Sequence, residues 1–563
     1  MFSSLRATIA TDPDANEPPR FDDWLSTPEP QRRHLPWNIG LVLLLVVACF
    51  VPRALMAWRI NTICVDGVVY FRLANDLENR QVAADDGGRL QSGTYPMALA
   101  SLHRLGFDWE TAAEFYGVLL STLAVLPLFG WVRRQFDERV ATVACLLYAF
   151  HPKLIEWSPE AVREPSFWFF FLLALYLMWR AAVEVDWRWF IAGGAVVALT
   201  CLTRFEGWFL LFPLVGWTAL RFFRLRVGRW RLVSGFIGGV VTLPLVFFVF
   251  GQLLPGNNNW DHLRIEPMQR AGTWLLSWSE YLAEAPEPPP SPQPAVTPGG
   301  PPPAAPATFG ETSSMFVRIA ERGLTPLFGI FMLGGLLASP RLFYRSENWP
   351  ILLIALAVAA GIWIHLWYAH QASSRYVLTI VLVTMQGAAI GVLEFGRLAG
   401  RWLSERWPRA QLMATVGALV VVAAVGTVDA VSSDFRSRAA LASLGRWIHD
   451  QYPRAPLIVG SENQLMLVGY YAQGSAFFFP PELAGDALAG WVEQVKPDAV
   501  VISKRRQTPA EYQAIIDRCE QLGLAVVEEN QIATPTKNIL VLARVQSEPE
   551  HIRQAAFTSA TKP

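Results

Sequence analysis

The pattern of hydrophobic positions is dominated by apolar runs of about 20 residues, separated by polar connections. Runs of this length predict membrane-spanning helices, because about 20 apolar residues are needed to cross the hydrocarbon core of a bilayer. We predict about eleven such spans. They lie roughly at 38–58, 113–132, 139–154, 165–183, 188–203, 207–222, 232–253, 324–340, 349–368, 376–395 and 411–431.

The positions of basic residues between these runs predict the orientation. Basic clusters precede the first span ("RRHLPW") and follow the second, sixth and tenth spans, as in "RRQFDER" and "RFFRLRVGRWR". Cytoplasmic connections carry an excess of Lys and Arg, so residues 1–36 are expected to form a cytoplasmic tail. With an odd number of spans, the chain beyond 431 is expected to be extracytoplasmic, in a multi-pass plasma membrane protein such as one of the bacterial inner membrane.

The remaining connections, which are poor in basic residues, then face outward, and any chemistry is expected there. These outer connections are 59–112, 154–164, 204–206, 254–323 and 369–375. The loop 254–323 contains a Pro-rich stretch at 285–307, which is typical of an extended spacer because Pro fixes φ and lacks a donor.

Beyond the spans, a different pattern indicates a second domain. The membrane domain is expected to cover 37–431, followed by an α/β domain at 432–545 and a flexible tail at 546–563. From about residue 435, short apolar strand patterns alternate with helix patterns, which favours a largely parallel sheet. This region lacks the glycine-rich motifs of nucleotide-binding loops, so no nucleotide is expected.

Composition agrees with the membrane assignment and excludes one class of partner. The chain is 52% hydrophobic and only 17% charged, with 23 Trp and 34 Phe in 563 residues. This is too apolar and too aromatic for an ordinary soluble protein. The formal net charge is zero, so no basic surplus exists to neutralise phosphates along a nucleic acid.

The first outer connection contains an acidic residue, Asp66, at the start of the predicted helix "DGVVYFRLANDLENR". Tyr70 follows it by one helical turn and therefore shares its face. Asp is a common N-cap residue, so a capping role is one interpretation. An outward-facing carboxylate at the membrane surface is also a candidate base, and the two roles are compatible.

Two further outer turns hold carboxylates and cations. Glu160 and Glu164 precede the fourth span, and they would share a helix face if that helix began at Pro159. Arg204 and Glu206 occupy a very short turn between the fifth and sixth spans. These two residues are expected either to form a salt bridge between helices or to contact a substrate.

The last outer turn, "HQASSRYVLT", holds His370, Arg375 and Tyr376. His365 and His370 are five residues apart, which is a poor spacing for a metal on a helix. An Arg fork suits a phosphate, so we predict cationic and donor roles towards an anion.

In their order along the chain, these motifs resemble the GT-C glycosyltransferases of family 39. The segments that carry the resemblance are "VDGVVYFRLA", "TYPMALASLHRLG", "REPSFWFFFLLALYL", "LTRFEGWFLLFP" and "SRYVLTIV". This family includes protein O-mannosyltransferases and the bacterial aminoarabinose transferase that modifies lipid A. The resemblance implies a membrane-embedded inverting enzyme that moves a sugar from a polyprenyl phosphate to a protein, lipid or glycan acceptor on the outer face.

The resemblance also implies roles for individual residues. Asp66 would be the base or acceptor-orienting carboxylate, Glu164 the second catalytic acid with Glu160 as its alternative, and Arg375 the group at the donor phosphate. Arg204 and His370 are further candidates for the phosphate, and Tyr70, Glu206 and Tyr376 for substrate binding. Two departures leave the subfamily and acceptor open: Gly67 stands where many relatives have a second acid, and Phe205 stands where Pro is usual.

The chemistry of the donor also predicts that no cofactor is needed. Pyrophosphate donors usually require a divalent metal held by several carboxylates, and the sequence contains no compact acidic triad. We therefore predict no metal site. The alternative functions are a flippase or transporter for lipid-linked sugars, and an O-antigen ligase or polymerase.

Overall fold

The computed structural model describes a helical membrane part and a small α/β part. It describes residues 38–60, 62–79, 93–225, 227–253, 308–339, 348–369, 373–403, 409–432, 436–460, 465–478 and 492–544, apart from 493, 504–512, 514–515, 518, 522 and 528–538. The predicted tails 1–36 and 546–563, the spacer 285–307 and His370 lie outside these residues. The chain forms two compact units, which are described separately below.

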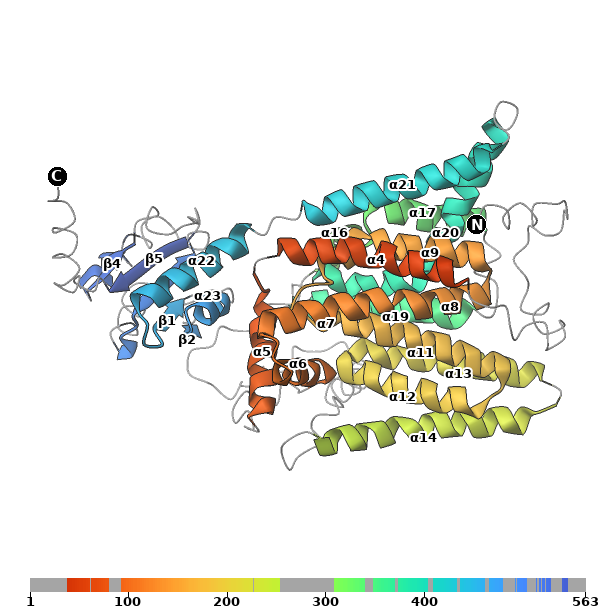
Figure 1. Ribbon diagram of the computed structural model, residues 1–563, viewed down its shortest axis with the longest axis horizontal. Helices are drawn as coiled ribbons and strands as arrows, with labels where there is room; N and C mark the ends of the chain where they lie inside the picture. The colour runs from red at the N-terminus through yellow and green to blue at the C-terminus, as the bar shows by residue number, and fades with distance from the viewer. Residues whose placement is uncertain are drawn as a thin grey trace, which may run out of the picture. The chain divides into compact units, whose positions relative to one another are not determined.

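The first compact unit contains the long apolar helices. Figure 1 shows these helices running side by side along one direction. The elements are α4 (Ile39–Arg59), α6 (Thr94–Arg104), α7 (Trp109–Leu123), α8 (Val125–Gln135), α9 (Glu138–Phe150), α10 (Pro152–Glu156), α11 (Glu164–Glu184), α12 (Trp187–Thr203), η1 (Phe205–Leu210), α13 (Leu211–Arg224), α14 (Arg229–Leu253), α16 (Phe309–Leu324), α17 (Pro326–Ala338), α19 (Trp349–Ala369), η4 (Ser374–Val377), α20 (Leu378–Leu403) and α21 (Ala410–Val431).

Each of the eleven predicted spans overlaps at least one of these helices, but not all of the helices are long. Seven helices in the described part are long and apolar enough to cross a membrane, and α16 with α17, bent by 94°, would make an eighth. The other three predicted spans contain α9, α12 and α13, which have 13, 17 and 14 residues. The fold is therefore that of a multi-pass membrane protein.

Side-chain burial explains how the bundle suits a membrane. The core contains large aromatic side chains with almost no exposed surface, among them Trp131, Trp168 and Phe171. By contrast, α4, α14 and α21 present exposed apolar side chains such as Val47, Phe248 and Val420. Large contiguous apolar surfaces are unfavourable in water and are expected where lipid covers them.

The α/β part has a mixed sheet, which corrects the prediction of a largely parallel one. Its elements are α22 (Arg436–Gln451), β1 (Leu457–Gly460), α23 (Leu465–Tyr471), β2 (Ser475–Phe478), β3 (Ala499–Ser503), β4 (Leu524–Val526) and β5 (Ile539–Arg544). The strand order is β2-β1-β3-β5-β4, in which β1 pairs in parallel with β2 and β3, whereas β5 is antiparallel to β3 and β4. The last strand enters between β3 and β4 in the reverse direction, an arrangement that apolar runs alone do not predict.

The first outer connection is divided between the two compact units. Residues 60–72 group with the chain from Asp434 onward, whereas the residues from Leu73 group with the helical bundle. Both parts are joined within one continuous helix, α5 (Val65–Glu78), which coincides with the predicted helix. At the far end of α5, the Glu78 Oε2 atom lies 2.7 Å from His103 Nδ1 of α6, where it accepts a hydrogen bond from the imidazole.

Candidate active site

Two predicted residues, Arg204 and Glu206, lie in a tight turn between α12 and α13. Arg204 follows the last residue of α12 with extended backbone (φ −150°, ψ 149°), and η1 begins at the next residue. Gly207 permits this turn, because a Cβ there would lie 2.6 Å from the backbone nitrogen of Cys201. The sequence thus turns both charged side chains into the bundle instead of continuing the helix.

Arg204 is almost fully paired with carboxylates. Its Nη1 donates to Glu164 Oε1, its Nη2 donates to Glu206 Oε1, and its Nε donates to Glu206 Oε2 at 3.1 Å. Only 5% of the Arg204 side chain is exposed. The salt bridge between Arg204 and Glu206 considered from the sequence is therefore present, and it is bidentate, the stronger form of an Arg–carboxylate pair, while a single bond to Glu164 ties Arg204 to α11.

Glu206 is kept ionised by this pairing. Burial alone would raise the pKa of its carboxyl group, but the adjacent guanidinium of Arg204 holds that pKa below its usual value. Glu206 therefore acts here as an anion that orients Arg204.

Glu164 joins the Arg204 pair to a second arginine. It is the first residue of α11, and Pro165 follows it in the first turn, where a Pro is readily accommodated. Its carboxylate is 3% exposed and contacts both Arg204 and Arg375, with Arg375 Nε 3.2 Å from Glu164 Oε1. Protonation of Glu164 would break two buried ion pairs, so the geometry favours a positioning role for this residue over a proton-transfer role.

Arg375 is the more exposed of the two arginines. It lies in η4, where the Ser373 side chain accepts a hydrogen bond from the Arg375 backbone N–H at 3.4 Å. Its side chain is 17% exposed. Helix α16 packs closely on this turn, since a Cβ at Gly323 would lie 2.9 Å from the Ser374 carbonyl oxygen.

Aromatic rings surround the two guanidinium groups. The Arg204 guanidinium carbon lies 5.6 Å from the ring centre of Phe167 and 5.3 Å from that of Tyr376. The guanidinium carbon of Arg375 lies 5.5 Å from the ring centre of Trp157 and 5.7 Å from that of Tyr376. Tyr376 was a predicted site residue, whereas Phe167 and Trp157 were not. The sequence could have indicated both aromatic residues, because each lies three residues from a charged residue of the same outer turn, Phe167 from Glu164 and Trp157 from Glu160.

Glu160 is buried nearby, but not in the predicted conformation. Helix α11 begins at Glu164 and not at Pro159, so Glu160 and Glu164 do not share a helix face. Glu160 lies in a bend in which the Val162 backbone N–H donates to the Glu160 carbonyl oxygen at 2.7 Å. This bend packs tightly on α7, because a Cβ at Gly117 would collide with the carbonyl oxygen of Ser158.

Two other predicted site residues, Asp66 and Tyr70, belong to the second compact unit. Asp66 and Tyr70 are half-buried residues of α5 in the second compact unit, and Asp66 is the second residue of the helix and not its N-cap. A carboxylate in the first helical turn is still favoured by the helix dipole. Among the described residues, no group of three or more His, Cys, Asp or Glu side chains is arranged to hold a metal.

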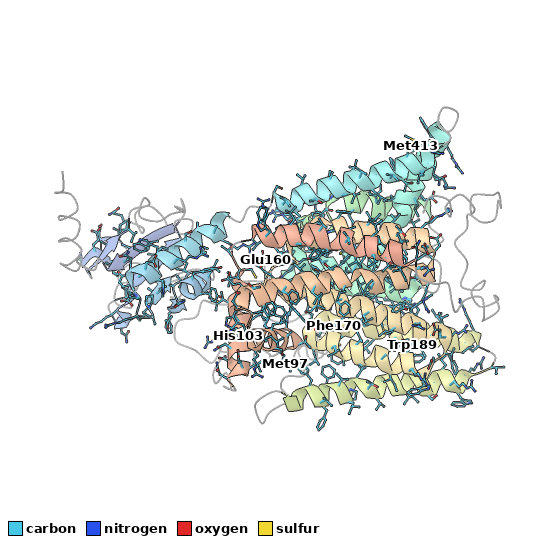
Figure 2. All side chains as sticks on the ribbon, in the orientation of Figure 1. Met97, His103, Glu160, Phe170, Trp189 and Met413 are labelled. Atoms are coloured by element: carbon cyan, nitrogen blue, oxygen red, sulfur yellow. The ribbon has the colours of Figure 1, made fainter. Side chains whose placement is uncertain are left out.

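Glu160 and the basic connection after the second predicted span lie towards opposite ends of the bundle. Figure 2 shows Glu160 and His103 towards one end and Trp189 towards the other. At the Trp189 end, Glu184 accepts from Trp189 Nε1 at 2.9 Å and pairs with Arg134 at 2.6 Å. The basic connection after the second predicted span therefore lies at the end opposite to Glu160.

The fold is found in two solved glycosyltransferases. An apo oligosaccharyltransferase from Archaeoglobus fulgidus is 14% identical, with 91% of this chain and 75% of that chain covered at a TM-score of 0.55. ArnT from Cupriavidus metallidurans, bound to undecaprenyl phosphate, is also 14% identical, with 91% and 98% covered at a TM-score of 0.52. The chain thus has the GT-C glycosyltransferase fold, as the motifs predicted.

A family match covers part of the chain. Residues 95–250 match the family described as dolichyl-phosphate-mannose-protein mannosyltransferase. The matched range includes Glu164, Arg204 and Glu206, whereas Asp66 and Arg375 fall outside it. No curated protein matches the chain significantly in sequence. The predicted resemblance is confirmed: the chain has the GT-C fold, and residues 95–250 match this family of mannosyltransferases in sequence.

Proposed function

We propose that the protein transfers a sugar from a polyprenyl monophosphate to an acceptor with inversion at the anomeric carbon. The observation that carries this proposal is the buried cluster of Arg204, Glu164 and Arg375 among aromatic rings. A phosphate that leaves a sugar carries negative charge, and a preorganised guanidinium stabilises that charge without further reorganisation. The bound undecaprenyl phosphate of ArnT is consistent with such a donor.

Each residue has a distinct proposed role. Asp66 accepts the proton of the acceptor nucleophile as that nucleophile bonds to the anomeric carbon and the bond between this carbon and the phosphate oxygen breaks, so that the polyprenyl phosphate leaves. Arg375 binds the phosphate that leaves. Glu164 and Arg204 hold Arg375 in place, and Tyr376 covers both guanidinium groups. Tyr70 and Glu206 remain proposed contacts of the substrates, Glu160 an alternative acid, and His370 a further phosphate ligand.

The function is tested by deleting the gene and restoring it with wild-type or variant sequences. Mass spectrometry of lipids, proteins and surface glycans is expected to reveal one conjugate that loses one sugar in the deletion strain and regains it with the wild-type gene. Unchanged glycoconjugates and lipid-linked sugars across all fractions would contradict the proposal. Accumulation of the polyprenyl-linked sugar in the deletion strain would identify the donor.

Replacing Arg375 with Ala is expected to weaken binding of undecaprenyl phosphate by about 10- to 100-fold. The reason is that a hydrogen bond to a charged group contributes about 1.5–3 kcal/mol. Binding to the purified protein in detergent measures this effect. Arg375→Lys is expected to be intermediate, because it retains the charge and loses the fork. Undecaprenol, which lacks the phosphate, is the control ligand, and its affinity should be the same for the wild type and both variants. If Arg375→Ala weakened the binding of both ligands equally, the phosphate role of Arg375 would be refuted.

We also propose that the Glu160 end of the bundle and the α/β domain are extracytoplasmic. The basic residues at the Trp189 end support this orientation by the positive-inside rule. All five native cysteines are buried, so single thiols at exposed positions can report the topology. Gln451→Cys is expected to react with a membrane-impermeant maleimide in intact cells or spheroplasts, and Arg188→Cys only after lysis. The reverse labelling pattern would invert the proposed orientation.

A further inference from the structure

Residues 60–72, the segment that carries Asp66, pack in the same compact unit as the α/β domain. From the contacts within this unit we propose that Tyr471 of α23 is a positioning residue for Asp66. The proposal rests on the proposed function, in which Asp66 is the base. It gives the α/β domain a part in positioning the base, in addition to any contribution to folding.

Two contacts of α23 bracket Asp66 along the chain. The backbone N–H of Ile63, three residues before Asp66, donates to the Tyr471 hydroxyl oxygen at 3.3 Å. The ring of Phe71, five residues after Asp66, lies 5.8 Å from the ring of Tyr470. Ile63 and Phe71 are 6% and 3% exposed. Two consecutive tyrosines of α23 therefore contact the chain just before α5 and in the second turn of α5, on either side of Asp66 in the sequence.

Tyr471 is itself firmly placed. The guanidinium of Arg446 in α22 lies 4.8 Å from the centre of its ring. Helices α22 and α23 approach closely at Gly445, where a Cβ would lie 2.7 Å from the Cβ of Tyr471 and 2.6 Å from the Val468 carbonyl oxygen. The Tyr471 hydroxyl is therefore a fixed acceptor, and its position is set by the packing of the α/β domain.

The hydrogen bond acts on the backbone that enters α5. The Ile63 N–H lies just before the helix, and the Gly67 N–H donates to the Cys64 carbonyl oxygen at 3.0 Å in the first turn. A fixed position of Ile63 therefore fixes the direction of the first turn of α5. The Asp66 carboxylate, which lies on this turn, is placed with it. A base must lie within hydrogen-bond reach of its proton, and a displacement of about 1 Å can cost about 100-fold in rate.

The test is a double-mutant cycle with Tyr471 and Asp66 in the full-length protein. Tyr471→Phe removes the hydroxyl and keeps the ring, and Tyr471→Leu removes both. With Asp66 present, Tyr471→Leu is expected to lower kcat by about 10- to 100-fold, and Tyr471→Phe is expected to lower it by less. In both variants, KM for the lipid-linked donor is expected to stay within about twofold of the wild-type value. In the Asp66→Asn background, neither substitution should lower the residual rate further, because no base remains to be positioned.

The outcomes separate this inference from the proposed function. Wild-type activity of Asp66→Asn would overturn the role of Asp66 and this inference with it. A large loss in Asp66→Asn, together with equal effects of Tyr471→Leu in both backgrounds, would overturn the inference and leave the proposed function intact. An equal effect in both backgrounds is the signature of a general loss of folded protein.

Hydrogen exchange gives a readout that does not depend on activity. Backbone amides of residues 60–72 are expected to exchange faster in Tyr471→Phe than in the wild type, whereas those of α9, in the other unit, should be unchanged. Gly445→Ala, which pushes against Tyr471 without altering its hydroxyl, should have the same effect on residues 60–72. Unaltered exchange of residues 60–72 in both variants would overturn the inference, even if the residual rate of Asp66→Asn were too low to measure.

Discussion

Replacing Asp66 with Asn is expected to slow sugar transfer by at least about 100-fold while the protein remains folded. The amide has nearly the same shape as the carboxylate, but it does not accept the proton of the acceptor, and general base catalysis typically contributes 10²–10⁴-fold. The amount of sugar-bearing conjugate made per unit of membrane-inserted protein, determined by mass spectrometry, measures this loss. Restored transfer in Asp66→Glu would further support proton transfer as the role of this position.

The same helix offers a matched control for Asp66. Asp76 is another partly exposed carboxylate of α5, close to the opposite end. Asp76→Asn makes the same chemical change and is expected to keep wild-type transfer. Near-normal transfer in Asp66→Asn would rule out the base assignment, and equal losses in both variants would point to the stability of α5 instead.

Replacing Arg204 with Met is expected to destabilise the protein by about 3–5 kcal/mol. Removing one partner of a buried ion pair leaves an uncompensated charge, and Glu164 and Glu206 would both lose a cation in this variant. The midpoint of thermal unfolding in detergent should therefore fall markedly, and transfer should be lost because Glu164 no longer holds Arg375 in a defined place.

A second substitution tests this explanation. Glu206→Gln removes one of the two uncompensated carboxylates, so Arg204→Met combined with Glu206→Gln is expected to be more stable than Arg204→Met alone. Glu206→Gln by itself should have a smaller effect, since Arg204 keeps its bond to Glu164. An unchanged unfolding midpoint in Arg204→Met would show that the cluster contributes no net stability.

The helices were predictable because the membrane imposes a length on apolar runs. The sharp bend at the start of one run was not. Thr325 adopts φ +59° between α16 and α17, and the chain bends there by 94°. The sequence Thr325-Pro326 does not predict a bend of this size, because Pro is also common in the first turn of a helix that continues in the direction of the preceding one. Side-chain packing around the bend decides it.

The candidate site was predictable in part for a similar reason. Arg204 and Glu206 are two residues apart in a short turn, so their pairing could be considered from the sequence alone. Glu164 is 40 residues from Arg204 along the chain, and their contact depends on the rotation of α11 and α12 about their axes. The order of spans predicts which ends share a face of the membrane, but not which side chains turn towards one another.

The hydrogen bond between Ile63 and Tyr471 joins residues 408 positions apart, which has a consequence for biosynthesis. At translation rates of about 5–20 residues per second, roughly 20–80 seconds pass between synthesis of the two partners. During this interval the buried Ile63 and Phe71 lack the surface that later covers them. The surroundings of Asp66 are therefore among the last parts of the protein to be completed. A chain released before α23 is synthesised would contain the helical bundle but would lack the contacts of Tyr470 and Tyr471 with the segment that carries Asp66.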